Sequence, residues 1–230
     1  MASIPPAPHS PRPGYCHYDD AAASYDGHFT RPVDEWEDAR LAELLRPVVD
    51  GRIVLDLGCG TGWVADHLEP RDYTGVDCSG PMLAELASKH PAARTVKAEV
   101  GAEAWVRALP YRRYPVITAT WSLEYLGDLD ILLSVCARLC VPGGVLALHG
   151  SLPRGHHRAH FSVRAAPYRP LSPRLVRRAS DRALLPRPRA AGTGALPDTW
   201  TRLGHRAWTA ALAAPAGRHY AALWTWRLPS

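Results

Sequence analysis

Two aspartates and three glycines form the part of the sequence best suited to hold a nucleoside. Gly58, Gly60 and Gly62 alternate shortly after Asp56, and Asp77 ends the next short apolar run. Alternating glycines let the backbone turn with positive φ and let a ligand approach with no Cβ in the way. A carboxylate can accept hydrogen bonds from two adjacent hydroxyls, such as those of a ribose. These residues therefore predict a site for a nucleoside-containing cofactor.

A strand, a loop and a helix must position these residues. Residues 53–57 form an apolar, β-branched run that predicts a buried parallel strand. Residues 63–68 predict a helix whose N-terminal amides face the loop ligand. Residues 73–77 predict a second strand, which places Asp77 near the interval at which nucleotide-binding folds present a carboxylate to a ribose. Together, the strand, the glycine loop and the helix predict the first strand-loop-helix unit of a nucleotide-binding α/β fold.

The glycine spacing indicates which cofactor to expect. In a G-x-G-x-x-G dinucleotide fingerprint starting at Gly58, the third glycine would fall at Trp63. The observed V-L-D-L-G-C-G-T-G instead resembles the first motif of the class I, Rossmann-like S-adenosylmethionine-dependent methyltransferases. The resemblance implies S-adenosylmethionine as the cofactor. A glycine loop that serves only as a structural turn is the alternative.

The resemblance covers roughly residues 18–150. W-S-L-E-Y-L at 121–126 resembles the family's fourth motif, and P-G-G at 142–144 matches its turn into the fifth strand. The resemblance places Met82 on the adenine side of the cofactor and Glu99 near the adenine amino group, although Glu99 as a solvated loop acid is an equal alternative. The implied cofactor site comprises Tyr18, Tyr25, Asp56, Gly58, Cys59, Gly60, Gly62, Asp77, Cys78, Met82, Glu99, Val100 and Trp121.

The segment before the first strand resembles the lid of small-molecule methyltransferases. Tyr18 and Tyr25 match its aromatic positions, and either their hydroxyls contact the cofactor or substrate, or their rings cover the sheet edge. Asp34 and Glu37 have capping-box spacing at the start of a helix that Pro47 and Gly51 help to end. Ser79 predicts the cap of a later helix.

The order of strands and helices predicts the fold. Further strands are expected at 94–98, 114–120 and 145–149, with a helix from 129 to 139. The expected fold is a doubly wound, mostly parallel seven-stranded sheet with helices on both faces and an N-terminal helical lid. By analogy, 199–213 and 219–227 supply the last two strands. We expect a disordered lead-in at 1–14 and one domain at 15–230, with lid helices at 15–50, the cofactor core at 51–150, and a substrate-side segment with the closing strands at 151–230.

Methyl transfer needs little chemistry from the protein. The sulfonium leaves as a neutral group, so the main task is to align the acceptor and to exclude water. A hydroxyl acceptor usually needs a general base. Glu124 and His149 stand at predicted strand ends and are the candidates, with a surface cap as the alternative for Glu124. No metal is expected, because the 156–160 histidine cluster lacks a nearby cysteine or carboxylate and better suits a solvated loop.

Composition limits the function classes. The chain of 230 residues carries a net charge of +5 and contains no apolar run long enough to span a membrane. Five cysteines without a C-x-x-C pair predict packing residues in the reducing cytoplasm. The predicted function is methylation of O or N on a small metabolite, in a natural-product setting, with no nucleic-acid partner. Oligomeric state, monomer or homodimer, stays open.

Other functions compete with this prediction. The ten arginines and one acid of residues 151–190 suggest an RNA or protein methyltransferase using residues 154–189. The segment has few aromatic residues, and no N/D-P-P-Y follows the fourth strand, which disfavours a nucleic-acid substrate. A non-catalytic cofactor-binding scaffold and a nicotinamide-linked dehydrogenase are the remaining alternatives.

Overall fold

The structure is a computed structural model that describes residues 18–30, 32–100, 103–151, 172–192 and 221–230. Its seven-stranded sheet has the order β3-β2-β1-β4-β5-β7-β6. Strands β1 to β5 pair in parallel, whereas β7 runs antiparallel to both β5 and β6. The strands are β1 Ile53–Leu57, β2 Asp72–Asp77, β3 Arg94–Lys97, β4 Tyr114–Ala119, β5 Cys140–Ser151, β6 Arg189–Gly192 and β7 Ala221–Arg227. The predicted fold class is confirmed.

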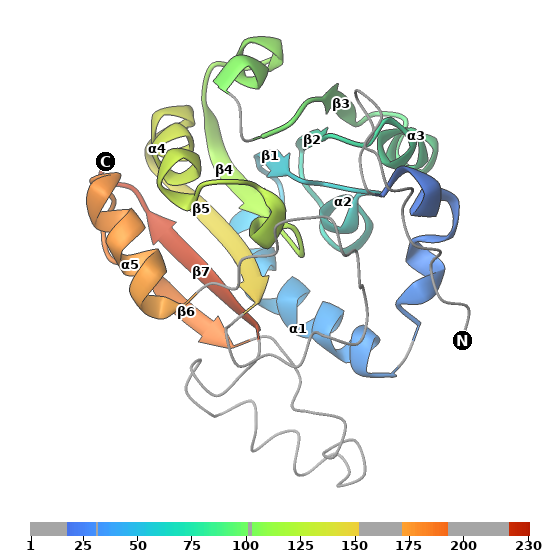
Figure 1. Ribbon diagram of the computed structural model, residues 1–230, viewed down its shortest axis with the longest axis horizontal. Coiled ribbons are helices and arrows are strands. Elements are labelled where there is room, and N and C mark those ends of the chain that lie inside the picture. The colour runs from blue at the N-terminus through green and yellow to red at the C-terminus, as the bar shows by residue number, and fades with distance from the viewer. Residues whose placement is uncertain (1–17, 31, 101–102, 152–171, 193–220) are drawn as a thin grey trace, which may run out of the picture.

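Helices cover both faces of the sheet, as predicted. On one face, α1 Pro32–Val49, α2 Trp63–His67 and α3 Gly80–Lys89 share an apolar core with Val54 of β1. On the other face, α4 Leu129–Leu139 and α5 Pro173–Arg182 pack with Leu55 of the same strand. This split follows from the alternation of side chains along a strand. Figure 1 shows the N-terminal residues (dark blue) beside α3 at one end of the sheet and α5 (orange) at the other.

The chain order reverses between β1 and β4, which lie side by side at the centre of the sheet. Open α/β sheets bind their ligands at such a reversal, beyond the carboxyl ends of the strands. The glycine loop follows β1 directly, and a short 3-10 helix, Leu123–Tyr125, follows β4. The topology therefore brings the two predicted motifs to one edge.

Strand β5 begins earlier than predicted. Tyr114 pairs with Cys140 and Val116 with Val145, so the register shifts where Pro142, Gly143 and Gly144 lie. These residues form an irregularity inside the strand instead of a turn before it. The Gly143 amide donates to the Pro229 carbonyl at 2.9 Å, so the C-terminal residues satisfy the irregular backbone.

The predicted closing strands are partly wrong. The sixth strand is β6, Arg189–Gly192, which lies before the residues predicted to form it. The predicted strand at 199–213 lies outside the described residues, as do the lead-in at 1–14 and the histidines at 156–160. Strand β7 agrees with the prediction for 219–227 from residue 221 onward. Among the described residues, β6 is a four-residue edge strand that pairs with β7 alone, so its local sequence signal is weak.

Two details of α1 differ from the prediction. The helix begins at Pro32, so Asp34 lies inside its first turn and is not the N-cap. Pro47 also lies inside the helix, two residues before its end. Gly51, with φ of 69°, follows the helix in the left-handed conformation that favours glycine.

The cysteines among the described residues behave as predicted, except for Cys78. Cys59, Cys136 and Cys140 are free and buried, and burial raises the pKa of the Cys136 thiol to about 12. Cys78 is disulfide-bonded, which contradicts the expectation of reduced packing residues. Within the described residues, no cluster of side chains could hold a metal ion. None of the helices described there is long and apolar enough to cross a membrane.

Candidate active site

Two glycines of the loop are required by packing. Gly58 has φ of 64°, and a Cβ there would lie 2.6 Å from the Cβ of Ser122. Gly62 has φ of 101°, and a Cβ there would lie 2.5 Å from Cδ1 of Leu86 in α3. Real Cβ atoms do not approach other atoms this closely. The loop is therefore pressed between the segment after β4 and helix α3.

Gly60 differs from its two neighbours. Its φ is 52°, and a Cβ at this position would meet no atom within 4 Å. Its amide donates to Oδ2 of Asp77 at 2.9 Å. Gly60 thus presents bare backbone to open space beside a carboxylate, which suits close approach by a ligand.

Backbone amides fix the orientation of the Asp77 carboxylate. Oδ2 accepts from Gly60, and Oδ1 accepts from the Ser79 amide at 2.8 Å. Each carboxylate oxygen has a second lone pair, so the group can still accept from two ligand hydroxyls. Burial raises the pKa of Asp77 above its usual range, and the amide hydrogen bonds oppose this rise. The sheet and the loop together prepare an acceptor for vicinal hydroxyls.

Asp56 lies beneath the loop with no exposed surface. Its carboxylate accepts from the Tyr73 hydroxyl and from the Thr118 hydroxyl, each at 2.7 Å. These contacts join strands β1, β2 and β4 through one buried group. Burial raises the pKa of Asp56 to about 6, although both hydroxyls oppose the rise. A direct contact between Asp56 and a cofactor stays a prediction.

We expect Asp56→Asn to change how stability depends on pH. Between pH 4 and 6 the folded protein holds the Asp56 proton that the unfolded chain releases, because the folded pKa is the higher one. This group therefore lowers the free energy of unfolding by about 1–3 kcal/mol as pH rises through that window. Urea unfolding of both proteins at pH 4.5 and pH 7.5 should show that loss in the wild type and a smaller loss in the variant. Equal losses of stability in the wild type and the variant would contradict the assignment of this pH dependence to Asp56.

The N-terminal segment, residues 18–30, is tied to the glycine loop and to both ends of α3. Asp19 accepts from the Ser79 hydroxyl at 2.6 Å, at the start of α3. Asp26 accepts from the Thr61 hydroxyl at 2.6 Å and from Lys89 Nζ at 2.9 Å. The segment therefore lies across the loop, where the sequence predicts a lid.

Three tyrosines meet beside this segment. The ring of Tyr18 lies 6.0 Å from the ring of Tyr25 and 6.0 Å from that of Tyr125, both in edge-to-face geometry. Burial raises the pKa of Tyr25, and the charges of Tyr125 and Asp77 raise it further. The two predicted aromatic residues thus pack against Tyr125 and against each other.

The two predicted catalytic residues have different positions. His149 has no exposed surface, and its Nδ1 accepts from the Trp121 amide at 3.4 Å. Glu124 belongs to the 3-10 helix Leu123–Tyr125, and its side chain is not among the described ones. The described geometry therefore does not present His149 to an acceptor.

Four further predicted residues lie around the edge of the site. Met82 is buried in the first turn of α3, and its amide donates to Oγ of Ser79, the N-cap predicted from the sequence. Val100 is buried, whereas Glu99 beside it is exposed. Cys59 packs under the loop, where its Sγ lies 2.7 Å from the position of a Cβ on Gly75. Direct contact of these side chains with a cofactor stays a prediction.

Several residues of this site were missed by the sequence reasoning. Asp19 and Asp26 accept hydrogen bonds from partners 60 and 35 positions away in the sequence. Asp38 of α1 accepts from Nε1 of Trp63 at 2.7 Å, which ties α1 to the first residue of α2. The available signal was the hydroxyl on each partner, at Thr61 within the glycine loop and at Ser79 before α3. Nothing in the local sequence indicated their acidic partners, Asp19 and Asp26.

Comparison with known proteins shows which family this domain resembles. Residues 55–146 match the family model described as a methyltransferase domain. The chain carries a class I, S-adenosylmethionine-dependent methyltransferase domain. Its sheet is similar to that of the CcbJ methyltransferase from Streptomyces caelestis, with a TM-score of 0.64, 19% identity, and 94% of this chain and 99% of that one covered. S-adenosylmethionine is the cofactor that this family implies.

The alignments with curated relatives cover only part of each relative's length. A trans-aconitate 2-methyltransferase of Azoarcus sp. is 31% identical over 172 residues, which cover 72% of this chain and 64% of that protein. Nocamycin O-methyltransferase of Saccharothrix syringae is 33% identical over 150 residues, which cover 59% of this chain and 50% of that protein. The chain spans about 41–64% of the length of the curated relatives it matches.

The residues present fit the cofactor of the methyltransferase domain. The glycine loop and Asp77 both lie inside the matched range. The open space at Gly60 leaves room for a ligand against the backbone, and Asp77 keeps free lone pairs for ribose hydroxyls. Both features belong to the chain's own geometry and do not depend on the comparison.

Proposed function

We propose that this protein transfers a methyl group from S-adenosylmethionine to an oxygen atom of a small metabolite. The observation that carries the proposal is the pairing of Gly60, which leaves open space, with an Asp77 carboxylate held in place by two amides. Relatives named as O-methyltransferases support oxygen as the accepting atom. Nitrogen acceptors are the alternative within the same chemistry.

Each part of the described site has a role in this proposal. Bound S-adenosylmethionine supplies an electrophilic methyl group on a sulfonium that leaves uncharged. Asp77 binds the ribose hydroxyls, and the loop backbone at Gly60 lies against the cofactor. The N-terminal segment covers the site and excludes water, with Tyr18 and Tyr25 facing the bound molecules. Glu124 remains the candidate for accepting a proton from a hydroxyl acceptor.

Calorimetric titration tests the cofactor. We expect micromolar binding of S-adenosylmethionine and no binding of NADH. Incubation with S-adenosylmethionine and a panel of acceptors, followed by mass spectrometry, then tests transfer. The panel should contain trans-aconitate, other small carboxylic acids and phenols, and the product should gain one methyl group. Failure to bind S-adenosylmethionine would refute the proposal, and binding without transfer to any acceptor would favour a non-catalytic scaffold.

A variant of Asp26 tests the covering role of the N-terminal segment. Hydrogen bonds from Thr61 and Lys89 outweigh burial and lower the pKa of Asp26, so the carboxylate is charged and paired at neutral pH. We expect Asp26→Ala to weaken S-adenosylmethionine binding about three- to tenfold, because one exposed ion pair contributes modestly. Asp66→Ala removes another partner of Lys89 without touching the segment and serves as the control. Equal effects of both variants would contradict a covering role.

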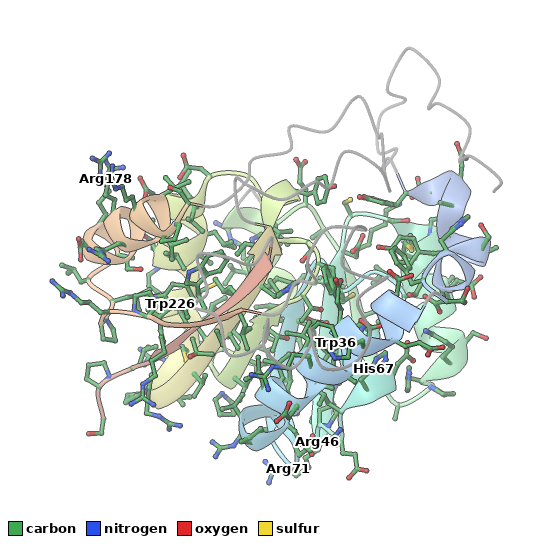
Figure 2. All side chains as sticks on the ribbon, turned by 90° about the horizontal axis from the view of Figure 1, so that it is seen from below. Trp36, Arg46, His67, Arg71, Arg178 and Trp226 are labelled. Atoms are coloured by element: carbon green, nitrogen blue, oxygen red, sulfur yellow. The ribbon has the colours of Figure 1, made fainter. Side chains whose placement is uncertain are left out.

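One observation favours a second function, methylation of RNA or of a protein. The outward face of α5 carries exposed Arg174, Arg177 and Arg178, and Arg178 projects from the end of the molecule away from Trp36 and His67 (Figure 2). These arginines form no ion pair within the part of the chain that the structure describes. Binding of RNA that weakens steeply with salt would promote this alternative. Binding that is absent at low salt would remove the RNA form of it.

A cytoplasmic location stays a prediction. It was inferred from cysteines expected to be reduced, and the disulfide at Cys78 does not agree with a fully reduced chain.

A further inference from the structure

The backbone at Trp121 is unusual. Trp121 has φ of 55°, one of two positive values found outside glycine among the described residues. A bulky residue in this conformation costs about 1–3 kcal/mol and persists only where its surroundings hold it. Trp121 stands just beyond β4, at the edge of the sheet that carries the glycine loop.

Two groups from distant elements hold Trp121. The backbone amide donates to Nδ1 of His149 in β5, and the two rings meet edge to face with centroids 4.2 Å apart. Asp38 of α1, which accepts from Nε1 of Trp63, also interacts with the Trp121 side chain. Burial raises the pKa of Asp38, and hydrogen bonds from the side chains of Trp63 and Trp121 oppose that rise.

The conformation of Trp121 directs the segment that follows. Ser122 then donates to the Leu57 carbonyl at 2.9 Å, beneath the start of the glycine loop. Tyr125, three residues further on, reaches the ring of Tyr18 in the N-terminal segment. A change in the Trp121 backbone would therefore move residues 122–125, which connect the glycine loop with the N-terminal segment.

We propose that His149 is a positioning residue for methyl transfer, which acts by holding the Trp121 backbone through Nδ1. The proposal rests on the proposed function and assigns His149 a role that differs from the general base expected from the sequence. An Nδ1 that accepts from an amide carries no proton, so a neutral His149 has its proton on Nε2. Complete burial of His149 keeps the ring away from the acceptor.

Two isosteric substitutions separate the roles of the two ring nitrogens. The amide oxygen of an asparagine can replace Nδ1, whereas the longer glutamine reaches toward Nε2. We expect His149→Asn to recover most of the acceptor kcat/KM, and His149→Gln and His149→Leu to lower it about 10- to 100-fold, the range for misplacing a reacting group. The Kd for S-adenosylmethionine should change less than kcat/KM in all three variants, since the hydrogen bond between Gly60 and Asp77 is untouched.

Hydrogen exchange at the Trp121 amide gives a readout that needs no turnover. In protein without ligand, exchange should be about tenfold faster in His149→Leu and His149→Gln than in the wild type, and near the wild-type rate in His149→Asn. Val145→Ala removes buried volume from the same strand and the same face of the sheet. As the control, it should lower stability without changing exchange at Trp121.

A double-mutant cycle covers the case in which a single variant folds poorly. Glycine adopts positive φ without help, so His149→Leu should cost little stability in a Trp121→Gly background. Full additivity of the two changes would overturn the proposal. So would a His149→Gln enzyme more active than His149→Asn, because that order would assign the role to Nε2. If the wild type transfers no methyl group, the proposed function fails, whereas the exchange rates still decide whether His149 holds Trp121.

Discussion

Replacing Gly60 by alanine is expected to weaken S-adenosylmethionine binding at least a hundredfold, equivalent to about 2.8 kcal/mol. The new Cβ would project into the open space that we assign to the cofactor, where it meets no protein atom within 4 Å. The unliganded fold should therefore remain, with a loss of about 1–2 kcal/mol for an alanine at a φ of 52°. Calorimetric titration and urea unfolding measure the two quantities.

Gly51→Ala provides the matched control for Gly60→Ala. Gly51 has φ of 69°, and a Cβ there also meets nothing within 4 Å. Its position after α1, at the other end of β1, separates it from the glycine loop. The two variants should lose similar stability, and only Gly60→Ala should lose cofactor affinity. Comparable affinities in both variants would place the cofactor elsewhere.

Replacing Asp77 by asparagine is the second change with a large expected effect. Asparagine has the same shape, but its amino group would face one of the two backbone amides that donate to the Asp77 carboxylate. Its single side-chain oxygen also cannot accept hydrogen bonds from both ribose hydroxyls in the way that a carboxylate can. We expect S-adenosylmethionine affinity to fall about 10- to 100-fold, from the loss of charged hydrogen bonds. Unchanged affinity would remove Asp77 from the ribose site.

The pH dependence of binding gives an independent check on Asp77. Burial raises the pKa of Asp77, so its carboxylate takes up a proton at a higher pH than an ordinary aspartate. Wild-type affinity should therefore decline as pH falls, starting above the usual aspartate range, and this decline should be absent in Asp77→Asn. Asp50→Asn is the control, because Asp50 also accepts a backbone amide, that of Glu69, at the far end of β1. It should leave both the affinity and its pH profile unchanged.

The sequence by itself determined the fold class and predicted the centre of the cofactor site. The strand, glycine loop and helix around Gly60 form from neighbours in the chain, and Asp77 follows at the end of the next strand. Each of these features depends on local periodicity and on backbone conformations that few residues can adopt. The five parallel strands were predictable for the same reason, whereas the two closing strands were expected only by analogy and the first of them was placed wrongly.

The local sequence was not sufficient where pairing decides the structure. Pro142, Gly143 and Gly144 have the composition of a turn, yet β5 continues through them because the C-terminal residues supply a partner for Gly143. Strand β6 was missed because its pairing with β7 decides its conformation, and its own four residues do not. In both cases a hydrogen-bond partner from a distant part of the chain overrides the local preference.

Only the tertiary structure decided what the side chains at the site do. His149 ends a predicted strand like a catalytic residue, yet its burial and its contact with the Trp121 amide give it a supporting role in our interpretation. Asp56 has the sequence position of a cofactor ligand but joins three strands under the loop. Periodicity tells which face of a strand a residue occupies, but not which groups from other strands and helices meet it there. Those neighbours set burial, pKa and hydrogen bonding, because they are brought together only when the sheet and its covering helices assemble.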